Sequence, residues 1–194
     1  MALDVQNGLS DEALLQAYAR GDNRAAEALT ARLLPAVFRQ ASRMLGDPTE
    51  AEDVSQEAML RLWRIAGAWR TGEAKPSTWL FRVTANLCTD RLRRRRGVGL
   101  DEIAEPLDDT PGAEDRLQAQ TRLDALQEGL NRLPERQRQA VVLRHIEGLS
   151  NPQIAEIMDI GLRAVESLTA RGKRALAEIM AGRKAELGFE DDTG

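Results

Sequence analysis

The sequence predicts an all-α protein of two small helical domains joined by a flexible acidic linker, with a helix-turn-helix in the second domain. Apolar residues recur at spacings of three and four along the 194 residues, which is the period of an amphipathic helix. No stretch stands out with the period-two alternation of a half-buried strand. Aromatic residues make up only 4% of the chain, so aliphatic side chains must build most of the core.

Capping residues bound the first two predicted helices. Ser10 can accept hydrogen bonds from the free N–H groups that start the first helix, and Gly21 can end it. A second helix is expected over residues 23–45. Pro35 lies inside it and predicts a kink or a break, because proline lacks the N–H that a helix interior needs. The apolar face expected for this helix comprises Ala26, Leu29, Leu33, Leu34, Val37, Phe38, Ala41 and Leu45.

A third helix is predicted to start at Asp47 and to run to about residue 69. Asp47 is an acidic cap, Pro48 fits the first helical position, and Glu50 fits the third. Large and polar residues away from its apolar face could dock a protein, since Trp and Arg are favoured interface anchors. The alternative is ordinary surface ion pairing between side chains four residues apart. The candidate docking residues are Asp53, Gln56, Glu57, Leu60, Arg61 and Trp63.

A fourth helix is expected over residues 78–96, after a loop over residues 70–77. Arginines gather toward its end, and aromatic residues lie near its start. Aromatic faces stack on unpaired bases and arginines neutralise phosphates, so this segment is a candidate nucleic-acid surface. The alternative is that its tryptophans are core residues and its arginines a solvated helix end. The candidate residues are Trp79, Arg82, Asn86, Asp90, Arg91, Arg93 and Arg94.

The net charge of −4 hides an uneven distribution. Residues 1–96 hold 15 basic and 12 acidic side chains, residues 97–115 hold no basic and 7 acidic ones, and residues 116–194 hold 12 of each. The middle segment is also rich in glycine and proline, which indicates a linker without its own core. We therefore expect an N-terminal domain over residues 1–96, a linker over residues 97–115, a C-terminal domain over residues 116–184 and an acidic tail over residues 185–194.

Two helices are expected between the linker and the helix-turn-helix. The first covers residues 113–131, and the second runs from Leu133-Pro134 to Gly148. Their apolar sets are Leu117, Leu123, Leu126 and Leu130 in the first, and Ala140, Val141, Leu143 and Ile146 in the second.

Residues 147–180 have the pattern of helix, tight turn and helix. Ser150 and Gln153 have the spacing of a capping box, and residues 159–162 provide the turn. A short helix that braces a longer, arginine-bearing helix is the geometry in which the second helix enters the DNA major groove. An ordinary helical hairpin is the alternative. The residues predicted to face DNA are Arg163, Glu166, Ser167, Ala170, Arg171 and Arg174.

Catalysis, metal binding and membrane insertion find no support in the sequence. It has no glycine-rich phosphate loop and none of the common hydrolase motifs, so we expect no enzyme, no cofactor and no small-molecule substrate. Cys88 is the only cysteine, which excludes an intrachain disulfide. His145, the only histidine, is better explained as a structural residue stabilised by a helix dipole than as a general base. Without a membrane-spanning or signal segment, we expect a cytoplasmic protein.

Three ordered segments resemble the signatures of extracytoplasmic-function (ECF) sigma factors. They are DPTEAEDVSQEAMLRLW, STWLFRVTANLCTDRLRRRR and LNRLPERQRQAVVLRHIEGLSNPQIAEIM. The resemblance covers roughly residues 10–180. It implies a bacterial initiation factor that binds core RNA polymerase at its clamp helices and flap and directs it to a promoter with −10 and −35 elements. It also implies a role in stress response and control by an anti-sigma factor.

The resemblance assigns roles to matching positions. Asp53, Gln56, Glu57, Leu60 and Arg61 match the helix that docks on the polymerase clamp helices. Trp79, Asn86 and Arg91 match the segment that engages the melted −10 strand. Ser167 and Arg171 match contacts of the −35 recognition helix. The acidic linker matches the segment that relatives thread through polymerase toward the RNA path.

The chain also departs from the family pattern. Pro76 stands where some relatives carry an aromatic residue, so a flipped −10 base would be held by other groups. Asp159 holds a turn position usually occupied by glycine, and Asp tolerates a left-handed backbone better than most residues. The chain also differs from the family pattern in and just before the recognition helix, so the resemblance does not give the −35 DNA sequence that this helix would recognise. The residues that differ are Gly161, Arg163, Ala164, Glu166 and Leu168.

Two other functions compete with the sigma-factor interpretation. One is a helix-turn-helix regulator that binds duplex DNA without polymerase and uses its N-terminal part for sensing or dimerisation. The other is a metal-dependent enzyme acting on nucleic acid through acidic residues such as Asp53 and Glu57. The basic fourth helix and the acidic linker favour the sigma factor.

Overall fold

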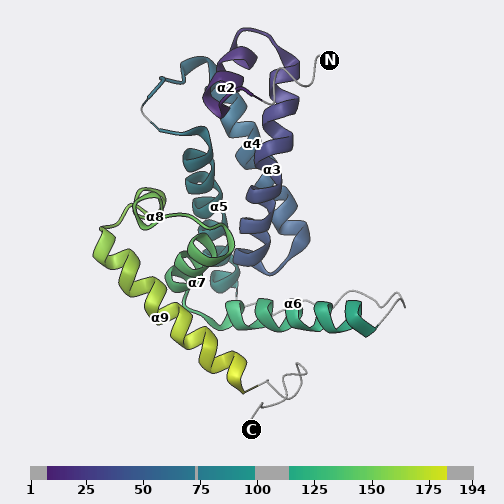
Figure 1. Cartoon of the computed structure of the whole chain (residues 1–194), viewed down its shortest axis with the longest axis vertical. Helices are drawn as coiled ribbons and strands as arrows, with labels where there is room; N and C mark the ends of the chain where they lie inside the picture. The colour runs from purple at the N-terminus through teal and green to yellow at the C-terminus, as the bar shows by residue number, and fades with distance from the viewer. Residues whose placement is uncertain (1–7, 73, 99–113, 183–194) are drawn as a thin grey trace.

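The computed structural model describes residues 8–72, 74–98 and 114–182, and in these ranges it contains helices and no strand. This confirms the predicted all-α class. Most of the predicted linker and the whole predicted tail lie outside the described residues, as does the side chain of Leu117. Figure 1 shows the helices α2 to α5 in one part of the molecule and α6 to α9 in the other.

The first part holds α2 (Asp11–Ala19), α3 (Asn23–Leu45), α4 (Pro48–Ile65), a short 3₁₀ turn η1 (Ala66–Ala68) and α5 (Pro76–Val98). The predicted caps are present: the Ser10 side chain accepts from the N–H of Ala13, and the Asp47 side chain accepts from the N–H of Glu50. Gly46 ends α3 in the left-handed conformation. A core cluster of leucines and alanines fills the space among these helices, including Leu14, Leu15, Leu29, Leu62 and Leu80.

The second part holds α6 (Glu114–Arg132), α7 (Glu135–Val141), a π-helical turn η2 (Val142–Ile146), α8 (Asn151–Met158) and α9 (Leu162–Ala181). The sequence predicted one helix up to Gly148, but the wider π turn interrupts it after Val141. Gly148 has φ of 69° and turns the chain toward α8.

Two further clusters join the two parts of the molecule. In one, Met44, Leu45 and Val54 pack with Leu130, Val141 and Val142. In the other, Phe81 of α5 packs among residues of α7, η2, α8 and α9. Arg138 is buried on α7 and donates to the carbonyl oxygens of Met44 (2.6 Å) and Asn131 (2.6 Å), which ties the ends of α3 and α6 together. The two halves therefore share a core in this structure.

Of the kink or break expected at Pro35, the break is absent, since α3 is one helix from Asn23 to Leu45. Pro35 is on the exposed side, where water can satisfy the carbonyl that lost its N–H partner. Phe38 was expected in the core but is 39% exposed, because Leu33, Val37 and Ala41 already define the inward face.

Leu123, also expected in the core, is 45% exposed. Figure 1 shows that the start of α6 projects away from the other helices, so the packed residues of α6 are the later ones, Leu126 and Leu130.

Candidate polymerase and nucleic-acid interfaces

The helix-turn-helix is built as the sequence predicts. Gln153 accepts from the backbone N–H of Ser150 (2.9 Å), and the capping box that starts α8 is present. Asp159 lies in the left-handed region, with φ of 51°, and makes the turn. Val165 is buried and holds α9 against α8. The six residues predicted to face DNA are all exposed on α9: Arg163, Glu166, Ser167, Ala170, Arg171 and Arg174.

Gly172 lets α9 cross α7 closely. A Cβ at this position would lie 2.6 Å from Cγ2 of Val141 and 3.1 Å from the carbonyl oxygen of Gln137. The α9 helix is therefore fixed along its inner side by a close backbone approach, and its opposite side is left for a ligand.

The candidate docking face on α4 is open to solvent. Asp53, Gln56 and Arg61 are exposed, and Leu60 is 49% exposed. Glu57 accepts from Nε of Arg61 (2.8 Å), so the predicted ion pair is present. That hydrogen bond lowers the pKa of Glu57, which keeps the carboxylate charged. The ion pair and the exposed leucine coexist on one face.

Trp63 lies differently from the rest of that set. It is half-buried, and its ring meets the ring of Tyr18 edge to face, with 4.8 Å between centroids. Trp63 packs against the core of the first part of the molecule. The Trp63 ring therefore lies mostly beneath the docking face and is not one of its projecting side chains.

The predicted nucleic-acid surface on α5 is split by the structure. Asn86, Asp90, Arg93 and Arg94 are exposed. Trp79 is half-buried and meets Trp69 edge to face, 6.1 Å between centroids, and both pack on the core, as the alternative interpretation of the tryptophans proposed. The remaining two residues of the set, Arg82 and Arg91, are held by neighbouring helices.

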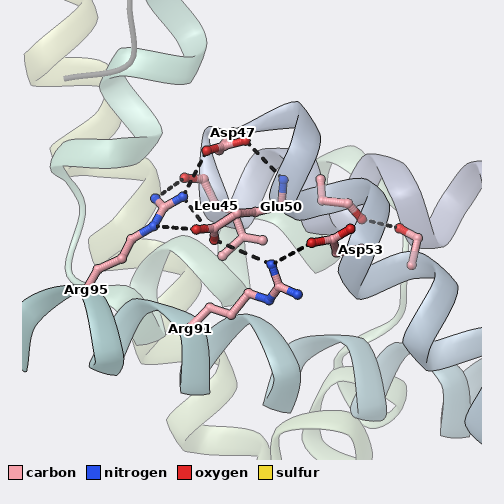
Figure 2. Close-up of polar contacts among 8 residues, drawn as sticks. Leu45, Asp47, Glu50, Asp53, Arg91 and Arg95 are labelled. Atoms are coloured by element: carbon pink, nitrogen blue, oxygen red, sulfur yellow. Dashed lines mark hydrogen bonds and ion pairs between the residues drawn. The ribbon is translucent and has the colours of Figure 1, made fainter. Parts of the chain in front are cut away.

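Figure 2 shows how Arg91 and Arg95 of α5 reach the first turns of α4. Arg91 lies 3.5 Å from the carboxylate of Asp53 and 3.9 Å from that of Glu50. Arg95 lies 3.0 Å from Glu50 and 3.3 Å from Asp47, and it donates to the carbonyl oxygen of Leu45 (3.1 Å). This network joins a predicted docking residue to a predicted DNA residue, and it fixes α5 against α4.

Arg95 and Glu50 were not predicted as partners. Arg91 and Arg95 are four residues apart, so they share one face of α5, and the acidic cap of α4 offers them carboxylates. That pattern was visible in the sequence, but the contact across 45 residues was not.

Neither His145 nor Cys88 lies in an environment that would suit it to catalysis. Partial burial, and then the positive charges of Lys173 and Arg144, lower the pKa of His145, so the predicted stabilisation of its charged form by a helix dipole is wrong. Burial raises the pKa of the Cys88 thiol to about 12. Among the described residues no group of three potential ligands could hold a metal ion. None of the described helices combines the length and the apolar character needed to cross a membrane.

Two family models match the chain. Sigma-70 region 2 matches residues 29–98, and Sigma-70, region 4 matches residues 123–176. The first match covers most of α3 and all of α4 and α5, and the second covers the later half of α6 and the helix-turn-helix as far as residue 176.

Individual proteins give the same result. The chain is 36% identical to the ECF RNA polymerase sigma factor SigM of Mycobacterium tuberculosis, over 88% of this chain and 85% of that protein. It is 34% identical to the ECF RNA polymerase sigma factor SigE of Mycolicibacterium smegmatis over 77% of this chain, and there it spans only 59% of the relative's length. The structure of CnrH in complex with the cytosolic domain of CnrY is similar with a TM-score of 0.67 and 26% identity, over 89% of this chain and 97% of CnrH.

The chain has an exposed recognition helix and, beside it, a second helical unit with its own polar face. This arrangement places it in the class of two-part helix-turn-helix DNA-binding proteins. The matches are more specific: this chain belongs to the ECF family of sigma-70-type RNA polymerase sigma factors. As a sigma factor it is not an enzyme, and binding to polymerase and to promoter DNA follows from its family.

Proposed function

We propose that the α4 face binds the clamp helices of core RNA polymerase. The observation that carries this proposal is the exposed Leu60 in the middle of a charged surface, where Asp53, Gln56, Glu57 and Arg61 surround it. An apolar anchor within a polar rim is the usual composition of a protein interface. Trp63 contributes by packing beneath this face.

The exposed part of α5 is proposed to engage the melted −10 strand. Asn86 carries an amide that can bind a base edge, while Arg93 and Arg94 are placed to neutralise phosphates. Asp90 lies on the same exposed side. Trp79 and Arg91 support this surface from within, because one packs on the core and the other pairs with α4. Arg82 belongs to the surface only once it is released from its present partner on α8.

The exposed face of α9 is proposed to recognise the −35 element in the major groove. Arg171 and Arg174 can donate to guanine or to phosphates, and Ser167 can contact either. Glu166 accepts only, so it favours a cytosine amino group and opposes a nearby phosphate. Arg163 and Ala170 complete the face, and the domain that carries it is proposed to rest on the polymerase flap.

Domain limits at 1–96, 97–115, 116–184 and 185–194 remain our proposal, as does action in the bacterial cytoplasm, where core polymerase transcribes. A polypeptide regulator is also proposed. CnrH, a structure similar to this one, is complexed with the cytosolic domain of CnrY, which supports an anti-sigma partner for this chain.

Substitutions separate these roles. The pair Asp53→Ala and Glu57→Ala should weaken binding to core polymerase in a competition assay and leave −35 duplex contacts intact. Asn86→Ala should leave core binding unchanged and impair promoter opening, which a fluorescent base in the −10 element reports. Equal losses of core binding in both variants would contradict the division between α4 and α5.

Arg171→Ala tests the −35 surface. A bidentate base contact is worth about 1–3 kcal/mol, so the variant should lose preference at one −35 position. Arg20→Ala removes the same charge from an exposed position at the end of α2, away from the proposed face, and it should leave that preference unchanged. If Arg171→Ala lowers affinity uniformly and does not change the preference, Arg171 contacts phosphate only.

A further inference from the structure

The helix α2 lies outside both family matches, because the Sigma-70 region 2 match begins only at residue 29. It is nevertheless firmly attached to the first part of the molecule. Leu14 and Leu15 are fully buried in the core cluster of that part, and Asp11 pairs with Arg32 of α3 at 2.8 Å. The position of α2 is therefore fixed, and its polar side chains can hold a neighbouring segment in place.

Two side chains of α2 contact the loop between η1 and α5. Oε1 of Glu12 accepts from the backbone N–H of Gly72 at 2.9 Å, and Nε2 of Gln16 donates to Oγ1 of Thr71. Glu12 and Gln16 are four residues apart, so they lie on one face of α2. The two hydrogen bonds join residues that are 60 and 55 positions apart in the chain. They attach the loop to a helix that is distant in sequence.

The loop depends on hydrogen bonds at this point. Gly72 has φ of 86°, a conformation that favours glycine, and a Cβ there would meet nothing within 4 Å. Glycine loses more backbone freedom on ordering than any other residue, and it has no side chain that could pack. The contact with Glu12 therefore restricts the most flexible residue of the loop.

The same loop leads into the proposed −10 surface. It ends at Pro76, where α5 begins, and Trp79 in the first turn of α5 meets Trp69 from the other end of the loop, with 6.1 Å between ring centroids. Lys75 is exposed in the loop, so it offers a cation to the phosphates of a strand that lies along α5. The arrangement of the loop therefore determines how the start of the −10 surface is presented.

We propose that Glu12 and Gln16 are positioning residues for the −10 strand: they hold residues 71 and 72 in place, and through them the loop and the start of α5. This inference rests on the proposed −10 surface of α5. A loop that is ordered before binding loses less conformational freedom when the strand binds, so its affinity for the strand is higher. Glu12 and Gln16 act through the loop and need no contact with DNA.

The direction of the effect separates positioning from simple electrostatics. Removing an acidic residue favours DNA binding in general, because DNA is negatively charged. If Glu12 acted only through its charge, Glu12→Ala would bind the −10 strand more tightly. Because it positions the loop, we expect Glu12→Ala to bind about two- to tenfold more weakly, the loss that corresponds to one hydrogen bond. Gln16→Ala changes no charge and should weaken binding within the same range.

The affinity is measured with the full chain bound to core polymerase. The probe is a fluorescein-labelled single-stranded oligonucleotide with the −10 sequence that run-off transcription selects, and fluorescence anisotropy reports its binding. Glu12→Gln keeps an oxygen that can accept from the N–H of Gly72, so it should restore the affinity. Glu27→Ala is the matched control, since it removes the same charge from an exposed position on α3, and it should bind no more weakly than the unsubstituted protein.

Hydrogen exchange of the free protein, followed by nuclear magnetic resonance, tests the attachment of the loop without DNA. The Gly72 amide should exchange about two- to tenfold faster in Glu12→Ala, and at the unsubstituted rate in Glu12→Gln and Glu27→Ala. Tyr18, near the other end of α2, packs against Trp63 beneath the docking face. Glu12 lies in the first turn of α2, so its substitution should leave this contact and the affinity for core polymerase unchanged.

Equal exchange of the Gly72 amide in all variants would overturn the proposal, because Glu12 would then not hold the loop. Faster exchange in Glu12→Ala with unchanged or tighter binding of the oligonucleotide would also overturn it. The same holds for a loss of affinity that Glu12→Gln does not restore, or for a loss of core binding in Glu12→Ala. Failure of the proposed −10 surface would be seen in a different variant, since Asn86→Ala would then bind the oligonucleotide as well as the unsubstituted protein does.

Discussion

The two glycines at helix crossings give the sharpest stability prediction. Gly172 of α9 and Gly129 of α6 both lie inside helices, where replacing Gly by Ala gains about 0.8–1 kcal/mol from helix propensity. At position 172 the new methyl group would lie 2.6 Å from the Val141 side chain and 3.1 Å from a backbone oxygen of Gln137. Valine is stiff and the backbone cannot retreat, so overpacking costs about 1–3 kcal/mol.

At position 129 the methyl group would meet Cδ1 of Leu176 at 2.8 Å and nothing else closer than 3.5 Å. The end of a leucine side chain can turn away at little cost. We therefore expect Gly129→Ala to be neutral or stabilising by up to about 1 kcal/mol, and Gly172→Ala to destabilise by up to about 2 kcal/mol.

Urea unfolding followed by far-ultraviolet circular dichroism measures both free energies of unfolding, with an unchanged m-value as the check that the unfolded states match. Because the two substitutions are chemically identical, their difference isolates the crossing of α9 over α7. A Gly172→Ala variant as stable as Gly129→Ala would refute the close approach.

Three further predictions use local contacts. Asp47→Ala should lower the free energy of unfolding by about 0.5–2 kcal/mol, because it removes the N-cap of α4 and an ion-pair partner of Arg95. Asp47→Asn should retain most of the cap. Equal losses of the two variants in urea unfolding would contradict the role of the cap. Burial raises the pKa of Cys88 from its ordinary value of 9.0 to about 12, so between these pH values the thiol is protonated in the folded protein and ionised in the unfolded one. The contribution of Cys88 to stability is therefore complete below about pH 9 and falls as the pH rises toward 12. A thiol reagent at pH 8 should label Cys88 only in urea, and rapid labelling of the folded protein would contradict its burial. Because the pKa of His145 is lowered in the folded protein, the contribution of its neutral form to stability is present above about pH 6.5 and is lost as the pH falls through the folded-state pKa. The His145→Gln variant should therefore lose less stability than the unsubstituted protein between about pH 7 and pH 5. Parallel pH profiles of stability would refute the lowered pKa.

The local features of the fold could be predicted because they depend on neighbours in sequence. The caps at Ser10 and Asp47, the capping box at Ser150 and the left-handed Asp159 each involve residues within a few positions. The exposed face of α9 follows from helical periodicity once Val165 is assigned to the core. The same reasoning identified the charged face of α4.

Long-range pairings could not be predicted in this way. Arg39 and Glu147 are 108 residues apart, and nothing in their local sequence marks them as partners. Phe81 stands beside the candidate nucleic-acid residues in the sequence, but it belongs to the core that joins the two parts. Phe38 and Leu123 have apolar side chains at helical spacing, yet the packing leaves them exposed. Periodicity gives the faces of a helix and not the partner of each face.

The most direct test of the central claim is run-off transcription with purified protein, core RNA polymerase and a library randomised at the −10 and −35 elements. The account predicts transcripts only when the protein is present, from templates enriched for one two-element sequence, with the −35 preference altered by Arg171→Ala and the −10 preference altered by Asn86→Ala. Transcription that shows no enrichment, or specific duplex binding that needs no polymerase and supports no transcription, would contradict it.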